Sequence, residues 1–304
     1  MPDGSVAAKG EVVLPAQARA APSRWGLVRL AQRSPMAFVG GFIVLAVVAV
    51  SAGAPLLSAA DPVKPSFGKR LRPPWGLGGT PEYVLGTDNL GRDIFARVLN
   101  GGRISLTLAA TGVVLAAAGG VVVGLLAGSL GGRVDDLVMR LCDVQLAFPV
   151  IMLAIALVAV IGTSPVALVG VLALSGWVLY ARTVRASVLT IRQLEYVEAA
   201  RGLGASDARV ITRHILPNTM ASILVIASSQ FATMVLLESG LSFLGMGIQP
   251  PQPSWGLMLA EGRDYLSNAW WLATIPGLAI SVVVLGANLL GDGLRDLLDP
   301  HLRQ

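Results

Sequence analysis

The sequence predicts an all-α integral membrane protein with six transmembrane helices. Three observations lead to this fold class: 54% of the 304 residues are hydrophobic, only 13% are charged, and the apolar residues gather in long uncharged runs. Soluble domains carry about 25% charged residues, so the composition excludes an ordinary soluble domain. A bilayer core of about 30 Å is crossed by roughly 20 apolar residues in a helix, and the runs reach that length.

Each span is expected from its own uncharged run. Residues 144–181 carry no charge, which is too long for one span at 1.5 Å per residue, and Gly162 to Pro165 interrupt them. They are therefore expected to form a helical hairpin, the third and fourth spans. The other expected spans are 36–60, 104–130, 219–237 with a continuation past Glu238, and one within 265–290.

The distribution of positive charge predicts the orientation. With six spans both termini lie on one side, where fifteen Lys and Arg residues would fall, against eight on the other side. The positive-inside rule therefore predicts cytoplasmic termini, and anionic lipid rather than nucleic acid accounts for the basic balance. No cleaved signal peptide is expected.

The expected organisation is a cytoplasmic tail 1–35, a transmembrane domain 36–300 with an extracytoplasmic segment 59–103, and a C-terminal tail 301–304. Within the first tail, residues 1–22 are expected to be disordered and 23–32 to form a short interfacial helix.

The polar segment 186–217 stands between two apolar spans and is predicted to form two helices. Gly204 is expected to turn left-handed at the end of the first helix. Ser206 or Asp207 is expected to cap the second helix, and Pro217 to end it. The expected ion pairs at i, i+3 spacing are Arg192 with Glu195 and Glu198 with Arg201. From these features alone, a solvated amphipathic connector is an equally good interpretation.

The string Gly86-Thr-Asp-Asn-Leu-Gly-Arg-Asp93 precedes the second apolar run. After it, an ion pair of Asp93 with Arg97 and an apolar face predict a short interfacial helix that ends near Asn100-Gly101. The apolar face consists of Ile94, Phe95, Val98 and Leu99. The acidic residues do not have the spacing of a calcium-binding EF-hand loop, so turns and helix caps are the better interpretation.

Glu238 stands late in the fifth span, and a carboxylate close to an apolar span is costly unless it faces a cavity or a partner. Glu238, with Ser239 and Ser242, is therefore a candidate for a translocation path. The alternative is an interfacial carboxylate that reaches water.

Gly120, Gly124 and Gly128 recur every four residues on the second span and predict close helix packing. The single cysteine, Cys142, excludes an intrachain disulfide.

Taken in order, these motifs resemble the permease subunits of bacterial ABC importers, in the branch that carries dipeptides, oligopeptides and nickel. Glu198-Ala199-Ala200, Gly204 and Leu216-Pro217 are similar to the EAA loop by which such permeases contact their ATPase subunits. The strings 86–93, 238–256 and 286–300 are similar to further segments of that branch. His214 resembles the peptide and nickel branch, and it is expected to pack or to form hydrogen bonds rather than to bind a metal.

The resemblance implies a type I ABC importer transmembrane domain with a cytoplasmic EAA coupling loop. It implies these coupling residues: Glu195, Glu198, Ala199, Ala200, Arg201, Gly204, Asp207, His214 and Pro217. It implies an extracytoplasmic motif of Gly86, Thr87, Asp88, Gly91, Arg92 and Asp93. The implied partners are a second permease chain, two cytoplasmic ATPase subunits that bind ATP and Mg, and an extracytoplasmic substrate-binding protein. No metal or cofactor is expected on this chain.

The implied function is ATP-driven import of di- or oligopeptides, with nickel complexes or glutathione as alternative substrates. The sequence contains no Gly-x-x-x-x-Gly-Lys-Ser/Thr string, so ATP hydrolysis is expected on separate subunits and the chain is not expected to be an enzyme. An ion-coupled secondary transporter is a further alternative. It would need ionisable groups near the middle of the membrane, and the second, third, fourth and sixth expected spans offer none.

Overall fold

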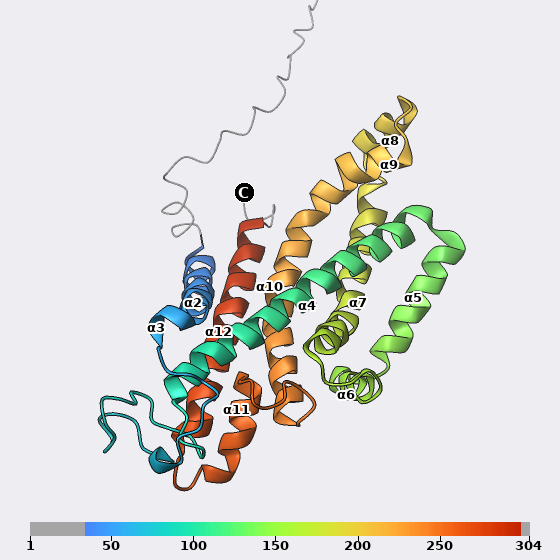
Figure 1. Ribbon diagram of the computed structural model, residues 1–304. Coiled ribbons are helices and arrows are strands. Elements are labelled where there is room, and N and C mark those ends of the chain that lie inside the picture. The colour runs from blue at the N-terminus through green and yellow to red at the C-terminus, as the bar shows by residue number, and fades with distance from the viewer. Residues whose placement is uncertain (1–33, 299–304) are drawn as a thin grey trace, which may run out of the picture.

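The computed structural model describes residues 34–298, and these residues form helices joined by loops (Figure 1). Within this part of the chain, five helical stretches are long and apolar enough to cross a membrane. They are α2 (Pro35–Ala52), α4 (Ile94–Leu130), α7 (Pro165–Ile191), the stretch Asp207–Phe243 that contains α10 (Leu216–Phe243), and α12 (Trp271–Leu298). The expected disordered tail, the helix at 23–32 and the tail 301–304 lie outside the described residues.

A bent pair of helices supplies the remaining span. α5 (Gly132–Leu146) and α6 (Val150–Ile161) meet at 94°, and counting the pair as one span gives six. The hairpin prediction was right about the break, since Gly162 has a φ of 100° and α7 starts just after it. It was wrong about a full third span within 144–161, because the 12 residues of α6 reach only about 18 Å.

Residues 131–140, which lie between the expected second and third spans, contain the first turns of α5. Asp135 on α5 accepts two hydrogen bonds from the Arg185 guanidinium on α7, at 2.9 and 2.5 Å. This paired contact holds α5 beside α7, so the charged start of α5 is stabilised as a helix.

α4 is longer than the sequence predicts. Its 37 residues start at Ile94, so the separate short helix expected at 93–100 is wrong. Gly101 and Gly102 do not end the helix because they lie at close contacts. A Cβ placed on Gly102 would lie 2.5 Å from the Ser51 Oγ and 2.8 Å from the Trp255 ring. The lack of side chains at these two glycines lets α2 and α11 (Trp255–Gly262) come close to α4, and it does not produce a turn.

The glycine stripe on α4 packs against α7, as the sequence predicts. Cβ atoms placed on Gly120 and Gly124 would lie 2.4 and 2.5 Å from the carbonyl oxygens of Trp177 and Ala181. Only glycine permits this approach, and the two long helices therefore pack backbone to backbone. α12 packs on α2 and on α10, which completes the arrangement of long helices seen in Figure 1.

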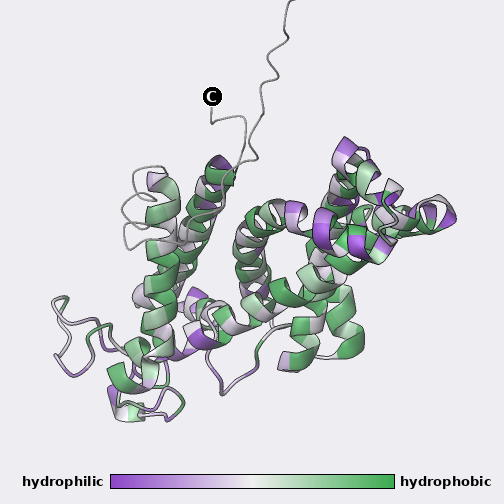
Figure 2. Ribbon diagram, turned by 90° about the horizontal axis from the view of Figure 1, so that it is seen from above, coloured by the Kyte–Doolittle hydropathy of each residue, from purple (hydrophilic) through white to green (hydrophobic). Residues whose placement is uncertain are grey.

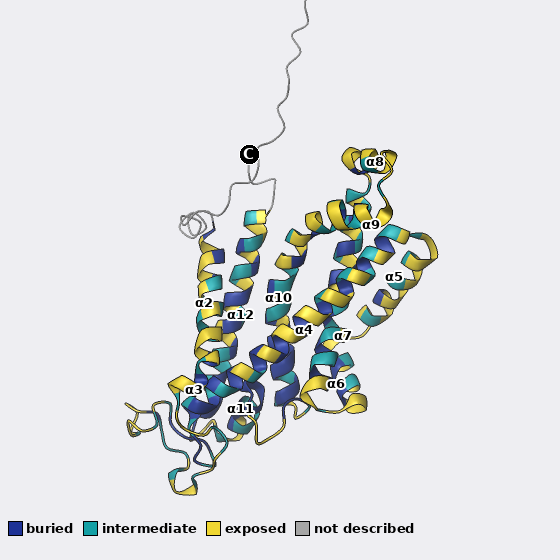
Figure 3. Cartoon of the chain, turned by 45° about the horizontal axis from the view of Figure 1, so that its top comes forward, coloured by how far each residue is buried: buried dark blue, intermediate teal, exposed yellow. Residues whose placement is uncertain are grey.

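The surface of the long helices is largely apolar. Figure 2 shows hydrophobic residues along the spans, with hydrophilic residues gathered mainly towards the ends. Figure 3 shows exposed residues on the outer faces of α2, α5 and α6. Large exposed apolar patches mark a surface that contacts lipid or another subunit, so this distribution agrees with a membrane protein.

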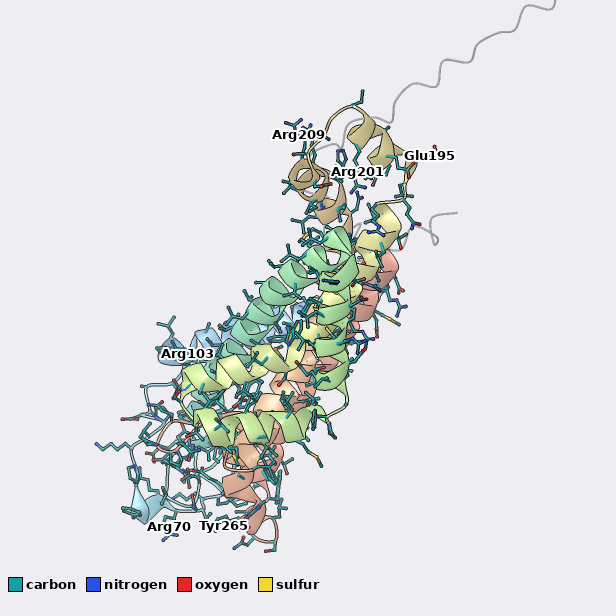
Figure 4. The ribbon with its side chains drawn as sticks, turned by 90° about the vertical axis from the view of Figure 1, so that its right-hand side faces the viewer. Arg70, Arg103, Glu195, Arg201, Arg209 and Tyr265 are labelled. Carbon is teal, nitrogen blue, oxygen red and sulfur yellow. The ribbon has the colours of Figure 1, made fainter. Side chains whose placement is uncertain are left out.

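The two ends of the molecule differ in structure (Figure 4). α8 (Glu195–Gly202) and α9 (Asp207–Val210) project at one end, where Glu195, Arg201 and Arg209 are labelled. The opposite end carries α3 (Ala54–Leu57), η1 (Phe67–Lys69), the loop that leads to α4, and η3 (Arg263–Tyr265) after α11. The two sequence motifs at 86–93 and 195–217 therefore lie far apart.

Candidate functional site

The projecting segment α8–α9 presents its polar residues outward. Three apolar side chains, Val197, Val210 and Ile215, are buried and anchor it to the rest of the chain. Leu203, at the tip, is 90% exposed. The predicted coupling residues are exposed at Glu195, Glu198, Ala199, Arg201, Gly204, Asp207 and Pro217, and half-buried at Ala200 and His214. The segment is thus anchored on one side, and its other side is exposed among the residues that the structure describes.

Gly204 turns the chain between α8 and α9. Its φ is 86°, and its N–H donates to the Arg201 carbonyl oxygen at 2.9 Å. The left-handed conformation predicted for Gly204 is confirmed, and it is one that side chains disfavour. Ser206 occupies the N-cap position of α9, but its side chain makes no capping hydrogen bond.

The two ion pairs expected in this segment are absent from the described residues. Arg201 instead lies 3.5 Å from Asp207, because the turn at Gly204 brings the start of α9 beside the end of α8. Arg192 precedes α8, so it lacks the helical geometry for a pair with Glu195. Its guanidinium donates to the Gly128 carbonyl oxygen at 3.1 Å.

Pro217 begins a helix and does not end one, which corrects the prediction. It lies in the first turn of α10, where a proline is tolerated. The residues before it form a π-helix, η2 (Ile211–Ile215), so the helical path is continuous from Asp207 to Phe243. His214 packs against Tyr196 with ring centroids 5.9 Å apart, in keeping with a packing role. Asn218 donates to the His214 carbonyl oxygen and to the Tyr196 hydroxyl.

At the opposite end, the segment 86–93 is a tightly bonded turn. Gly86 and Gly91 have φ values of 81° and 78°. The Asp88 carboxylate accepts from the backbone N–H groups of Leu90 and Arg92 at 2.8 and 2.9 Å. The Thr87 carbonyl oxygen accepts from the Trp271 indole of α12 at 3.3 Å, and its hydroxyl accepts from the Arg72 N–H at 2.9 Å. Turns and caps, and not a calcium loop, therefore describe this segment.

Four charged side chains join this turn to α4 and α11. Arg92 and Arg97, only 4% and 1% exposed, each bridge Asp88 and Glu261. The distances to Glu261 are 3.1 Å from Arg92 and 2.8 Å from Arg97. Buried charges are tolerated when they are paired in this way. We call these four residues the buried charge cluster.

The expected pair of Asp93 with Arg97 does not form. Asp93 instead caps α4 by accepting from the Phe95 N–H at 3.1 Å. Burial raises the pKa of the Asp93 carboxyl, and hydrogen bonds from the N–H groups of Phe95 and Ala96 oppose that rise. Sequence reasoning missed Glu261 as the partner, because it lies 164 residues from Arg97 and no local pattern signals the contact.

Glu238 lies inside the protein, where α10 meets α4 and α11. Its side chain is 1% exposed, and one carboxyl oxygen accepts from the Ser242 hydroxyl at 2.7 Å. The other carboxyl oxygen has no hydrogen bond within the described residues, and the hydroxyls of Ser105, Ser239 and Ser254 lie around the group. The alternative in which Glu238 reaches water is therefore wrong. Sequence reasoning found Ser239 and Ser242 beside it but missed Ser105 of α4 and Ser254, the residue that precedes α11.

Comparison with known proteins gives the family. Residues 120–304 match the family described as binding-protein-dependent transport system inner membrane component. The chain is 42% identical over 267 residues to the di/tripeptide transport system permease protein DppC of Pseudomonas aeruginosa, covering 87% of this chain and 88% of the relative. It is 39% identical over 272 residues to the dipeptide transport system permease protein DppC of Alkalihalophilus pseudofirmus, covering 90% and 88%.

A third relative carries a different substrate in its name. The glutathione transport system permease protein GsiD of Pectobacterium atrosepticum is 42% identical over 271 residues, covering 89% of both chains. The helical spans, the extent of the family match and these identities agree with each other. The chain belongs to the binding-protein-dependent inner membrane transport family, and it is a multi-pass permease subunit of an ABC importer with the type I fold.

Proposed function

We propose that the protein forms, with a second homologous permease chain, the translocation path for di- or oligopeptides. The relatives named above carry peptide transport in their names and align over almost the whole chain, which supports a peptide substrate. Glutathione, itself a tripeptide, is the alternative that the GsiD relative supports. Nickel complexes remain the second alternative from the sequence motifs.

The α8–α9 segment is the proposed contact with the ATPase subunits, and its geometry is the observation that carries the proposal. The segment projects from the membrane-spanning part (Figure 1), and Leu203 and Glu198 on it are exposed. An exposed apolar residue within a polar rim is typical of a docking surface. We infer that two ATPase subunits, which bind ATP and Mg, hold this segment in the complex.

The connection from α9 into α10 supports a mechanical role. The helical path from Asp207 to Phe243 has 37 residues, about 55 Å at 1.5 Å per residue. A displacement of the α8–α9 segment would move α10, which packs against α4, α7 and α12. Closure of the ATPase dimer would thereby shift the helices as rigid bodies between outward-facing and inward-facing arrangements.

Substitutions at Gly204 and Glu198 test the coupling role. Gly204→Val forces a β-branched residue into a left-handed conformation, and Glu198→Lys reverses an exposed charge. Both variants are expected to insert normally and to lose uptake of a radiolabelled dipeptide by the complete complex. Gly202→Val is the matched control, because Gly202 also has open space around it but lacks a positive φ. Normal uptake and normal co-purification with the ATPases in both variants would show that the coupling assignment is wrong.

The orientation has a separate test. We propose that both termini and the α8–α9 segment are cytoplasmic and that the 59–103 segment faces the binding protein, as the positive-inside rule predicts. A cysteine at Ser66 should react with an impermeant thiol reagent in intact cells, and one at Ser206 only after permeabilisation. The native Cys142 is buried and gives a low background. The reverse labelling pattern would invert the topology.

A further inference from the structure

A large cavity opens at the end of the molecule opposite α8–α9. Its volume is about 650 Å³, within the range of small-molecule sites. Four separate parts of the chain line it: Pro62 before η1, residues of α4 between 100 and 108, Thr163 and Pro165 where α7 begins, and the loop 248–252. In the proposed orientation this is the side on which substrate arrives.

Among the described residues that line this cavity, Arg103 is the one that carries a charge. Figure 4 places it on α4 between the two ends of the molecule. Arg92 and Arg97, earlier in the chain, are paired with carboxylates, whereas Arg103 makes no hydrogen bond or ion pair within the described residues. It also lines a neighbouring cavity of about 280 Å³ with Ser51 and Thr107. Arg103 is exposed where it lines these cavities, so its charge is solvated there and is open to an anionic ligand.

The polar groups around Arg103 suit a zwitterion. The Asn100 side-chain amide donates to the Ala96 carbonyl oxygen at 2.9 Å, which leaves its own carbonyl oxygen as an acceptor. Gln249 likewise donates to the Gly245 and Gly247 carbonyl oxygens, both at 3.0 Å, and keeps a free acceptor. The cavity therefore offers one cation for an anionic end and neutral oxygens for N–H groups.

We propose that this cavity is a substrate subsite in which Arg103 pairs with the C-terminal carboxylate of an incoming peptide. The inference rests on the proposed peptide function. A guanidinium presents two parallel N–H donors that match the two oxygens of a carboxylate, so the pair is strong and orients the peptide. The ammonium and amide N–H groups then face the oxygens of Asn100 and Gln249. The carboxylate replaces the water that otherwise solvates Arg103.

The test compares a dipeptide with its C-terminal amide as substrates of the complete reconstituted complex. Arg103→Gln should lower uptake of the free acid about tenfold and leave uptake of the amide nearly unchanged. For each protein, the uptake rate of the free acid is divided by the uptake rate of the amide. Dividing this ratio for the variant by the ratio for the wild type cancels the binding protein's own preference. Arg103→Lys should keep part of the preference, because it keeps the charge but not the two parallel donors. Lys64→Gln removes an exposed positive charge outside the cavity and should leave the ratio unchanged.

A second measurement does not depend on folding of the Arg103 variants. A cysteine at Thr107, which also lines the cavity, is modified after assembly with a negatively or a positively charged thiol reagent. The negative reagent should compete for Arg103 and abolish the preference for the free acid, and the positive reagent should not.

Each adverse outcome has a distinct meaning. Equal loss of acid and amide uptake in Arg103→Gln would assign Arg103 to a lipid phosphate or to structure and overturn the subsite. An unchanged ratio in Arg103→Gln, or equal effects of the two reagents, would overturn it as well. A wild-type complex that imports no peptide would contradict the proposed function itself.

Discussion

The two ends of this permease contain similar kinds of residues, but their charged side chains are buried at one end and exposed at the other. The turn 86–93, which carries two members of the buried charge cluster, and the α8–α9 segment both combine charged side chains with positive-φ glycine, Gly86 and Gly91 in the turn and Gly204 in α8–α9. In the cluster, Arg97 is 1% exposed and both of its carboxylate partners belong to the same chain. In α8–α9, the pair of Arg201 with Asp207 is 3.5 Å long and exposed. The charges of the cluster are paired inside the protein and join its segments, whereas the charges of α8–α9 are exposed at the proposed contact with the ATPase subunits.

The largest effect is expected at Arg97, and it tests the cluster side of this comparison. Arg97→Ala leaves Asp88 and Glu261 without one of their two cations in a buried setting, which should destabilise the protein by about 3–5 kcal/mol. The measurement is the thermal unfolding temperature and the yield of the purified complex.

Arg201→Ala is the matched control for Arg97→Ala, because it removes the same side chain from an exposed pair. It should cost less than about 1 kcal/mol of stability while reducing ATPase-coupled uptake. Equal losses of stability in the two variants would remove the distinction between the two ends.

An intermediate effect is expected at Glu238. Its side chain is buried, like the charge cluster, but only one of its carboxyl oxygens has a hydrogen bond within the described residues. Glu238→Ala should leave the Ser242 hydroxyl without its partner and cost about 1–3 kcal/mol, seen as a lower yield of assembled complex. Glu238→Gln keeps the shape and an acceptor, so assembly and uptake should stay near normal. Weak uptake with normal assembly in the Gln variant would instead assign Glu238 to the translocation path.

The smallest effect is expected at the exposed pair of Lys69 and Glu82, 2.6 Å apart at the same end as the cluster. The hydrogen bond from Lys69 lowers the pKa of Glu82, and the hydrogen bond to Glu82 raises the pKa of Lys69. The Glu82 contribution is therefore present at neutral pH and lost as pH falls below the usual range of a Glu. The Lys69 contribution is lost as pH rises above the usual range of a Lys.

Glu82→Gln tests this pH dependence. The variant should unfold like the wild type at neutral pH within experimental scatter, because an exposed pair is screened by solvent. A large drop in unfolding temperature at neutral pH would show that the pair belongs with the buried cluster and not with the exposed surface.

Local physical rules let the sequence determine a large part of this protein. Uncharged runs of spanning length predicted the membrane helices, because the bilayer thickness fixes how many apolar residues a helix needs. The positive φ at Gly204 and the close packing at Gly120 were likewise predictable, since each depends on a missing side chain. The motifs at 86–93 and 195–217 indicated the family, which the comparisons confirmed.

Only the tertiary structure decided the features that join distant segments. Arg97 meets Glu261 and not Asp93, α4 continues through Gly101, and Glu238 is enclosed by serines from α4, from α10 and from the N-cap position of α11. The bend between α5 and α6 and the position of Pro217 in the first turn of α10 were likewise decided by the tertiary structure. Local patterns rank the conformations open to a short segment. Burial against residues far away in the chain selects one of these conformations. The sequence of the segment itself does not tell which distant residues will bury it.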